Sequence, residues 1–255
     1  MAMLELYHWE PNGSGLKNLI CLHEKDLDFA SHYIDLLAFA QCRPEFLALN
    51  PLGQVPVLVH DGKILTESQF INEYLDEVFP QAPLRPESAE GLWRMRVWGK
   101  FAGEVLAPAA STLGCHAYLA PALRGRELSA ELERIPMSER RLAWRMACEN
   151  AYGEELLEDS RRKAGIAIQR LEQRLADHDW LVGKAFSLAD IELFAWCNGL
   201  EALATDLLNS ARAPATIGWL NRMRERRGVA AALAHARSQT PASAYAPGPE
   251  HSRWG

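Results

Sequence analysis

The stretch EPNGSGLK, residues 10–17, places small, polar and backbone-bending residues ahead of an amphipathic run. An apolar strand-like segment precedes it, so a strand, a turn and a helix start should meet there. The first N–H groups of a helix lack backbone partners, and the helix dipole adds positive charge at the same point. Such a point binds an anion and lowers the pKa of a thiol held against it. Ser14 is placed either to cap this helix or to donate its hydroxyl to a ligand.

Two further stretches carry groups that suit a peptide-like ligand. In GQVPVL, a cis Val55–Pro56 bond would leave the Val55 N–H and C=O free to pair with another backbone, although a trans proline at an edge strand is commoner. In LTESQFI, the Ser68 hydroxyl can bind a carboxylate and Glu67 an ammonium group, although both also fit an ordinary helix start. Together they predict a ligand with an amino-acid head at Glu67–Ser68 and a reactive end near Ser14.

These residues lie at the ends of elements that alternate along residues 1–80, in the predicted order β-α-β-α-β-β-α. Asp61-Gly62 between two apolar runs predicts a tight hairpin. Residues 81–90, rich in proline, predict a linker, and residues 91–240 predict an all-helical domain. Residues 241–255, rich in Pro, Ala, Ser and Gly, predict a flexible tail. The fold class is therefore an α/β domain followed by an all-α domain.

Within the helical half, three local patterns are specific. A helix that begins near residue 91 should extend up to Pro108. Residues 139–178 carry long helical patterning. Ser187 and Asp190 have the spacing of a capping box at the start of a further helix.

Composition narrows the function classes. The net charge of −6 lacks the basic excess of nucleic-acid binding, and no apolar run is long enough to span a membrane. The N-terminus has no basic segment followed by an apolar one, as an export signal would. The five cysteines have no C-x-x-C spacing, which argues against disulfides, a zinc site or a redox pair. We therefore expect a cytoplasmic protein with no metal.

The motifs NPLGQVPVL, LTESQFINEYL and SLADIELF resemble those of the cytosolic glutathione transferases in order and spacing, along almost the whole chain. The resemblance implies a glutathione transferase fold with a thioredoxin-like N-terminal domain, and glutathione as co-substrate. It implies that Val55, next to Pro56, pairs with the cysteinyl backbone of glutathione and that Glu67 and Ser68 hold its γ-glutamyl group. Gln54 and Gln41 lie where glycyl-end contacts occur.

The resemblance also concerns the sulfur of glutathione. Tyrosine and cysteine commonly activate it in this superfamily, and neither occurs between Glu10 and Lys17. Ser14 is the first candidate for the sulfur contact and Asn12 the second, with backbone N–H groups assisting. Tyr7 lies within the strand and is assigned to the core.

A narrower resemblance joins the segments RMRVWGKF and RLAWRMACENAYGEELLEDSRRKAGIAIQRLEQRL to bacterial β-etherases that cleave lignin-derived aryl ethers. It is strongest to the branch that forms ordinary glutathione-transferase dimers. The implied reaction is attack of the glutathione thiolate on the carbon that bears an aryloxy group next to a ketone. An aromatic substrate needs an apolar wall, for which the candidates are Trp98, Phe101, Leu113, Tyr118 and Trp144. His116 is assigned to the surface.

Three alternatives share the same glutathione site. A broad-specificity glutathione transferase would differ only in its range of substrates. A glutathione lyase usually needs a cysteine at the helix start, where this chain has Ser14 and Gly15. A weakly active binding subunit, paired with a related active chain, would bind glutathione without activating it. The resemblance implies a homodimer or heterodimer in each case, with no nucleic-acid or membrane partner.

Overall fold

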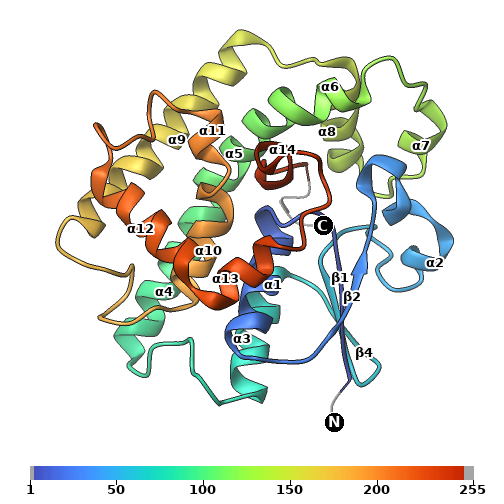
Figure 1. Ribbon diagram of the computed structural model, residues 1–255. Helices are drawn as coiled ribbons and strands as arrows, with labels where there is room; N and C mark the ends of the chain where they lie inside the picture. Colours follow the sequence, from blue (N-terminus) through green and yellow to red (C-terminus); the bar gives the residue numbers. More distant parts are fainter. Residues whose placement is uncertain (1–2, 250–255) are drawn as a thin grey trace.

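A four-stranded sheet with flanking helices forms the N-terminal part of the computed structural model, which describes residues 3–249 (Figure 1). Its elements are β1 (Leu4–His8), α1 (Gly13–Glu24), β2 (Ala30–Tyr33), the 3₁₀ turns η1 (Leu36–Ala38) and η2 (Ala40–Cys42), α2 (Pro44–Leu47), β3 (Val57–His60), β4 (Lys63–Leu65) and α3 (Ser68–Val78). The strands lie in the order β2-β1-β3-β4, with β1 parallel to β2 and antiparallel to β3. The predicted βαβαββα order is confirmed.

The β3–β4 hairpin turns at Asp61 and Gly62, as the sequence predicted. Both residues have positive φ, 47° and 79°, which is the backbone geometry that a two-residue hairpin needs. Strand β3 follows the Val55–Pro56 segment and pairs with β1, and β4 forms the edge of the sheet beyond it.

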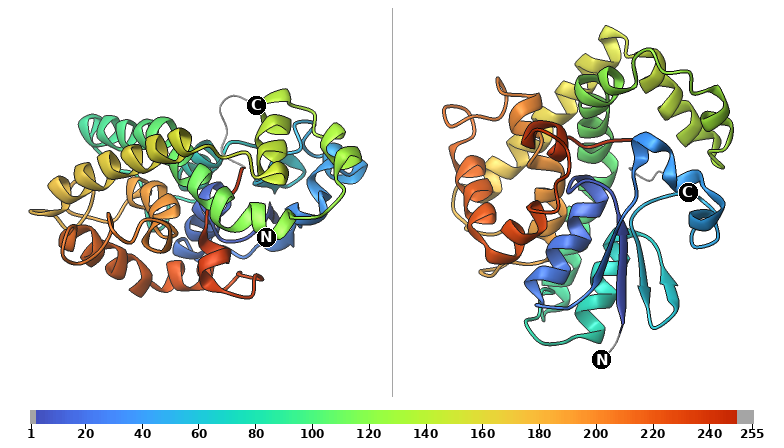
Figure 2. Two further views of the ribbon diagram at one scale, coloured as in Figure 1. Left: turned by 90° about the horizontal axis from the view of Figure 1, so that it is seen from above. Right: turned by 45° about the vertical axis from the view of Figure 1, so that its right-hand side comes forward.

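The remaining elements of the described chain are helical. They are α4 (Ala89–Phe101), the π-helical segment η3 (Ala102–Leu106), α5 (Ala107–Gly114), the π-helical segment η4 (Cys115–Leu119), α6 (Ala120–Leu123), α7 (Ser129–Glu133), α8 (Ser138–Glu149), α9 (Glu154–Leu175), α10 (Leu188–Cys197), α11 (Leu200–Leu203), α12 (Pro214–Glu225), α13 (Arg227–Leu233) and α14 (Pro241–Tyr245). The right-hand view of Figure 2 shows these helices packed beside the sheet and its helices.

The helix that begins at α4 does not end at Pro108, which corrects the prediction. Residues 89–123 are helical without interruption, and the two prolines inside this run, Pro108 and Pro121, each follow a π-helical segment. Proline has no N–H to donate to the helix ladder. A π-helical turn already shifts the hydrogen-bonding register at that point, so the helix continues past each proline.

The long pattern over residues 139–178 is two helices rather than one. Helix α8 ends at Asn150, whose φ of 49° is the left-handed conformation of a helix C-cap, and α9 starts after Gly153. The polar left-handed residue and the glycine together break the helix between these positions. The periodicity was correct for both helices, and it gave no sign of the bend between them.

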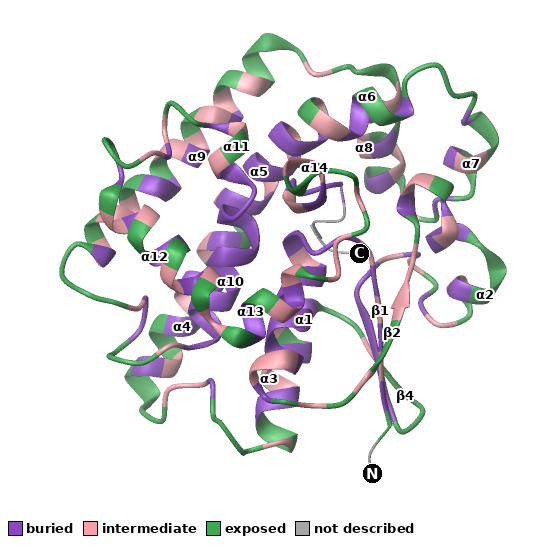
Figure 3. Ribbon diagram, in the orientation of Figure 1, coloured by how far each residue is buried: buried purple, intermediate pink, exposed green. Residues whose placement is uncertain are grey.

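Helix α10 is the centre of the helical part, because all ten of its residues are buried (Figure 3). The predicted capping box is present at its N-terminus. The Asp190 carboxylate accepts hydrogen bonds from the Ser187 N–H (3.0 Å), the Leu181 N–H (3.0 Å) and the Trp219 indole N–H (3.1 Å). Complete burial raises the pKa of Asp190 to about 6. One carboxylate thus joins the start of α10, the preceding loop and α12.

Helix α1 lies between the sheet and the helical part, packed against α3, α10 and α13. Most of its side chains are buried, and even Lys17 is enclosed. The Lys17 ammonium pairs with the Glu192 carboxylate of α10 at 2.5 Å and lies 5.2 Å from the centre of the Trp196 ring. A charge buried in this way needs its partner. The pair therefore fixes α1 against α10.

The predicted flexible tail is corrected for residues 241–249, which are packed. Pro241–Tyr245 form α14, the Thr240 hydroxyl accepts the Ser243 N–H as an N-cap, and residues 246–249 are buried. Small residues and prolines, typical of loose chain ends, here allow the backbone to lie close against neighbouring helices. Residues 250–255 of the predicted tail lie outside the described residues.

Residues 3–249 contain neither a membrane-spanning helix nor a cluster of metal-ligating side chains. No helix there is long and apolar enough to cross a membrane. No group of at least three His, Cys, Asp or Glu side chains there is arranged to hold a metal ion.

Replacing Asp190 with alanine should destabilise the fold strongly. The substitution leaves the Leu181, Ser187 and Trp219 donors buried without an acceptor, and we expect a loss of about 3–5 kcal/mol in the free energy of unfolding. Urea unfolding measures it. Asp206→Ala is the control, because this carboxylate pairs with Arg161 at the surface, and its loss should leave the free energy of unfolding almost unchanged. Equal losses for the two variants would contradict the assignment.

Candidate active site

The turn between β1 and α1 presents the free N-terminus of α1. Asn12 is the N-cap residue with an extended backbone, and no side chain caps the first turn. The N–H groups of Gly13, Ser14 and Gly15, the first three helical residues, therefore face a small pocket of about 20 Å³. Its lining residues are Trp9, Glu10, Asn12, Gly13, Ser14, Gly15, Leu36, Val55, Trp196 and Gly248. Unpaired donors at a helix N-terminus form an anion site, and we call this space the anion pocket.

Gly13 is required at the start of α1 for two reasons. Its φ is +42°, and a Cβ atom built on it would lie 2.8 Å from the Trp196 ring. The glycine thus allows the first turn of α1 to approach α10 more closely than a side chain would. Both Gly13 and Trp196 line the anion pocket.

Ser14 is the second residue of α1, so it is not the N-cap that one interpretation assigned to it. Its hydroxyl has no hydrogen-bond partner within residues 3–249, and it borders two adjoining pockets. Asn12 is held differently, because its side-chain N–H donates to the Ala244 carbonyl at 2.8 Å. The two predicted sulfur contacts therefore lie at the same pocket, with Ser14 free and Asn12 anchored.

No cysteine lines either pocket at the start of α1. Burial raises the pKa of the Cys21 thiol well above its usual range and that of the Cys197 thiol to about 12. A thiol with such a pKa is not a thiolate near neutral pH. The sulfur chemistry of this site must then use a thiol from a ligand.

The segment that leads into β3 contains the Val55–Pro56 bond, for which the sequence left two alternatives. The Val55–Pro56 bond is cis, which confirms the less common of the two alternatives. Asn50 shapes the preceding loop, since its side chain donates to the Gln54 carbonyl (3.0 Å) and accepts the Leu52 N–H (3.1 Å). Arg140 of α8 donates to the Leu52 carbonyl at 2.6 Å. The loop is thus held from within and from the helical half.

Glu67 and Ser68 stand where β4 gives way to α3. Glu67 has a φ of +67°, unusual for a residue other than glycine, and it is exposed. Ser68 is the first residue of α3 and is buried. Strained backbone of this kind is concentrated at ligand sites. Here it turns the Glu67 side chain and the α3 N-terminus toward one pocket.

That pocket, about 30 Å³, brings together most of the predicted peptide contacts, and we call it the peptide-contact pocket. Its lining residues are Ser14, Asn50, Gln54, Val55, Pro56, Thr66, Glu67 and Ser68. Gln41 does not line it, because Gln41 is fully buried, and its amide atoms have no hydrogen-bond partner among the described residues. Asn50 and Thr66 are lining residues that the sequence analysis missed. Asn50 lies in the NPLGQVPVL motif, four residues before Gln54. Its place in that motif was the signal that could have identified it.

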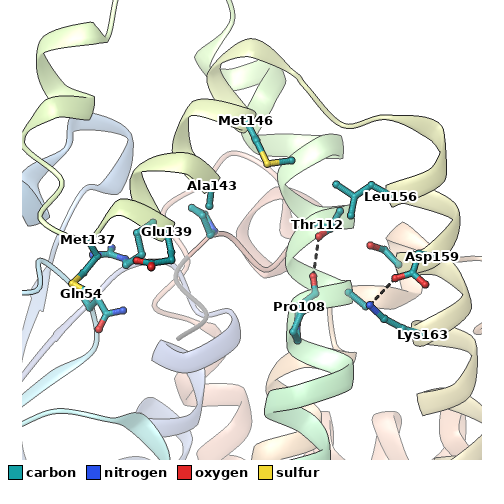
Figure 4. Close-up of a pocket in the computed structure, with 14 residues that line it drawn as sticks. Gln54, Pro108, Thr112, Met137, Glu139, Ala143, Met146, Leu156, Asp159 and Lys163 are labelled. Carbon is teal, nitrogen blue, oxygen red and sulfur yellow. Dashed lines mark hydrogen bonds and ion pairs between the residues drawn. The ribbon is translucent and has the colours of Figure 1, made fainter. Parts of the chain in front are cut away.

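A larger cavity of about 400 Å³ opens beside these small pockets, between the run from α4 to α6 and helices α8 and α9 (Figure 4). Gln54 and Met137 lie at one end of it, and Asp159 and Lys163 at the other. Most of its lining surface is apolar. The apolar lining residues are Pro108, Ala109, Met137, Ala143, Met146, Leu156 and Pro249, and the polar ones are Gln54, Thr112, Glu139, Arg140, Asp159, Ser160 and Lys163. Gln54 borders both this cavity and the peptide-contact pocket.

The five residues chosen for an aromatic wall do not line this cavity. The Arg170 guanidinium carbon lies over the Trp98 ring, 4.6 Å from its centre, and over the Phe101 ring, 4.3 Å from its centre. Trp144 is fully buried against Phe39. Leu113 is also buried, and Tyr118 is half-buried. Helical aromatic residues mostly fill the core, as Trp98 and Trp144 do here.

His116 is half-buried, and its Nδ1 lies 3.2 Å from the Asn150 side-chain oxygen. It does not line the large cavity. This contact at the C-cap of α8 accounts for its position. Its assignment to the surface is therefore only partly correct.

Comparison with known proteins identifies both halves of the chain. The family model "Glutathione S-transferase, N-terminal domain" matches residues 2–77, and "Glutathione S-transferase, C-terminal domain" matches residues 135–227. Protein LigF of Sphingobium sp. strain SYK-6 is 38% identical over 236 residues, covering 89% of this chain and 91% of that protein. Glutathione S-transferase 3 of Zea mays is 30% identical over 192 residues, covering 74% and 75% of the two chains.

A solved structure agrees with these sequence matches. The crystal structure of the β-etherase LigF from Sphingobium sp. strain SYK-6 has a TM-score of 0.87 with this chain at 36% identity. The match covers 91% of this chain and 99% of that one. The similarity thus includes the α8–α9 region that borders the large cavity as well as the sheet.

Gly13→Ala and Gly15→Ala form a matched pair at the start of α1. The first adds a Cβ in a left-handed backbone against Trp196, and we expect it to lower the free energy of unfolding by about 1–3 kcal/mol. The second meets no atom closer than 3.7 Å and should be neutral or stabilising by up to about 1 kcal/mol. Urea unfolding of both variants measures the difference. A tolerated Gly13→Ala would show that the contact with α10 is not tight.

Proposed function

The chain belongs to the glutathione S-transferase family, and from this premise we propose that it is a glutathione-dependent β-etherase. It would cleave the β-aryl ether bond of lignin-derived α-keto aromatic dimers and release a phenol and a glutathione thioether. The observation that carries the proposal is that three spaces adjoin one another. Ser14 borders the anion pocket and the peptide-contact pocket, and Gln54 borders the latter and the large cavity.

The proposed glutathione position follows the peptide-contact pocket. Val55, whose N–H and C=O precede the cis bond, pairs with the cysteinyl backbone, and Glu67 and Ser68 hold the γ-glutamyl head. Gln54 meets the glycyl end. Gln41 would also contact that end, and its amide, which lacks partners among the described residues, supports a role toward a ligand. Because Gln41 is fully buried, this contact requires the residues that cover it to move.

The proposed reaction is a single displacement. The glutathione sulfur, as thiolate, attacks the carbon that bears the aryloxy group. The new C–S bond forms as the C–O bond breaks, the electron pair leaves with the phenolate oxygen, and the phenolate then takes a proton from water. The adjacent ketone makes this carbon reactive, so the protein mainly stabilises the thiolate and aligns the attack. Ser14, Asn12 and the first N–H groups of α1 supply that stabilisation.

The large cavity is the proposed site for the two aryl rings. Its apolar walls remove ring surface from water, and its methionines, Met137 and Met146, adapt to rings of different shape. At the end opposite Gln54, the Lys163 ammonium pairs with Asp159 at 2.6 Å, and the hydrogen bond from Lys163 lowers the pKa of that carboxyl. This charged end suits the hydroxyl groups of a lignin-derived dimer.

Two competing functions remain testable. A broad-specificity transferase uses the same glutathione site with other electrophiles. A weakly active binding subunit is favoured by one observation, the absence of Tyr and Cys from residues 10–17. The two differ in whether the bound glutathione thiol is ionised near neutral pH.

The purified protein, given glutathione and a racemic α-keto β-aryl ether dimer, should release phenol until half of the ether is consumed. Chiral chromatography of the remaining ether identifies the enantiomer that is used. One pocket with fixed attack geometry accepts one configuration at the attacked carbon and inverts it. Ser14→Ala should lower kcat/KM by about 10²-fold, as for the loss of one donor to a developing or held anion.

The outcomes separate the three functions. Phenol release that stops at half supports the stereospecific β-etherase. Glutathione binding without phenol release, but with conjugation of other electrophiles, would identify the broad transferase. Binding with no conjugation and a thiol pKa as in free glutathione would identify the binding subunit.

We also propose a cytoplasmic dimer in which α3 and α4 form the interface. Phe70 on α3 and Trp93 on α4 are 63% and 62% exposed. The two helices lie side by side, since the Arg96 guanidinium pairs with Glu73 at 2.8 Å. Large exposed apolar side chains on adjoining helices are typical of an interaction surface. No disulfide links the five cysteines, all of which lie among the described residues, and this supports a reducing compartment.

The double variant Phe70→Glu/Trp93→Glu should sediment as a monomer if this surface joins two copies. Charges placed at the core of an interface lose hydration without gaining a partner. Leu142→Glu, on α8 and 58% exposed, is the matched control and should leave the dimer intact. Analytical ultracentrifugation measures both. A double variant that remains dimeric would locate the interface elsewhere.

A further inference from the structure

The segment after α13 returns to the β1–α1 turn and contacts it at several points. We define residues 237–249 as the strap, which includes α14 and lies beside the N-terminal end of α1 in Figures 1 and 2. The Arg237 N–H donates to the Glu10 carboxylate at 2.9 Å, and the Ala244 carbonyl accepts from the Asn12 side chain at 2.8 Å. The strap thus grips the turn that carries both sulfur candidates.

Side-chain contacts reinforce the first of these points. Tyr33 of β2 donates its hydroxyl to the other Glu10 oxygen at 2.7 Å, and the Arg237 guanidinium lies 4.2 Å from the centre of the Tyr33 ring. Glu10 is buried. A buried carboxylate requires such partners, so Glu10 joins the turn to both the sheet edge and the strap.

The strap is seated on helices that carry glycine at the points of contact. A Cβ built on Gly114 would lie 2.2 Å from the Pro247 carbonyl oxygen, and one built on Gly199 would lie 2.3 Å from the Tyr245 carbonyl oxygen. Both distances are far below any normal contact, and the opposing atoms are backbone. Any larger residue at either position therefore displaces the strap. Gly248 lies against the Trp9 ring, because a Cβ built on Gly248 would lie 2.9 Å from that ring.

The end of the strap separates the sulfur site from the substrate cavity. Gly248 lines the anion pocket together with Asn12 and Ser14, whereas Pro249 lines the large cavity. Both residues are buried. The strap is therefore a wall shared by the two spaces that the reaction must bring together.

We propose that the strap is a positioning element for the glutathione thiolate and that Ala244 acts through Asn12. An amide nitrogen carries two hydrogens. The Ala244 carbonyl accepts one of them and so fixes the rotation of the Asn12 amide, which leaves the second for the sulfur. The buried strap also keeps water from the anion pocket, which strengthens each hydrogen bond to the thiolate. This inference rests on the proposed glutathione site.

Gly199→Ala and Gly114→Ala test the strap without altering a residue that touches the ligand. We expect each to displace the backbone at residues 245–247 and to loosen Asn12. The pKa of the bound glutathione thiol, followed by its thiolate ultraviolet absorbance, should rise by about one unit, which is a tenfold smaller thiolate fraction below that pKa. kcat should fall by up to the same factor. The dissociation constant of glutathione, measured by calorimetry, should change far less, because Glu67 and Ser68 line the peptide-contact pocket, and no strap residue lines that pocket.

Gly103→Ala and Gly218→Ala are the matched controls, since a Cβ at either position meets no atom within 4 Å. Both should retain the wild-type thiol pKa, kcat and glutathione affinity. If either Gly199→Ala or Gly114→Ala fails to fold, Thr240→Ala decides the matter, because it removes only the exposed N-cap of α14. It should shift the thiol pKa in the same direction by a smaller amount.

The two proposals fail in different ways. A wild-type protein that does not bind glutathione overturns the proposed function, whatever the strap does. A wild-type protein that lowers the thiol pKa, with glycine and Thr240 variants that titrate and turn over like wild type, overturns the role of the strap. A raised thiol pKa and lowered kcat at unchanged glutathione affinity supports it, since a purely structural strap would not shift the titration.

Discussion

The structure depends on one constraint at helix α1, which must be buried along its length and open at its N-terminus. Its side chains pack against the sheet side, α3, α10 and α13, while its first three N–H groups have no capping side chain. A buried helix end without partners is costly. In the proposed function, the glutathione thiolate completes this open end, and the surrounding contacts hold the helix in place. The Lys17–Glu192 pair and the approach of Gly13 to Trp196 are two of these contacts.

The same constraint explains why distant parts of the chain converge at this point. The open end of α1 has walls from the β1–α1 turn, the Val55 segment, α10 and the strap. Helix α10 is able to take part because Asp190 fixes its start within the helical half. Stability and function are thus joined through α10. A loosened capping box would shift Trp196, and with it the wall of the anion pocket.

Local sequence patterns predicted the elements and the small pockets, because both depend on short-range backbone rules. The Asp61-Gly62 hairpin, the Ser187 capping box and the Val55–Pro56 turn each follow from residues close together in sequence. The large cavity did not follow, since periodicity shows that a helical face is buried but not what buries it. Trp98 and Trp144 carried the right chemistry and were used in packing instead. The packed strap was not predicted, because the glycines that it packs against, Gly114 and Gly199, lie far from it in sequence.

The proposed activation by backbone donors would make the sulfur site depend on geometry more than on any one side chain. A tyrosine or cysteine carries its own polar group to the sulfur, whereas an uncapped helix end works only if the turn before it is held rigidly. Here Glu10 and Asn12 are both buried and both bonded to the strap. The protein's own thiols cannot substitute, because no cysteine lines either pocket at the start of α1. Thiolate chemistry at this site therefore requires an incoming thiol and a turn held from the far end of the chain.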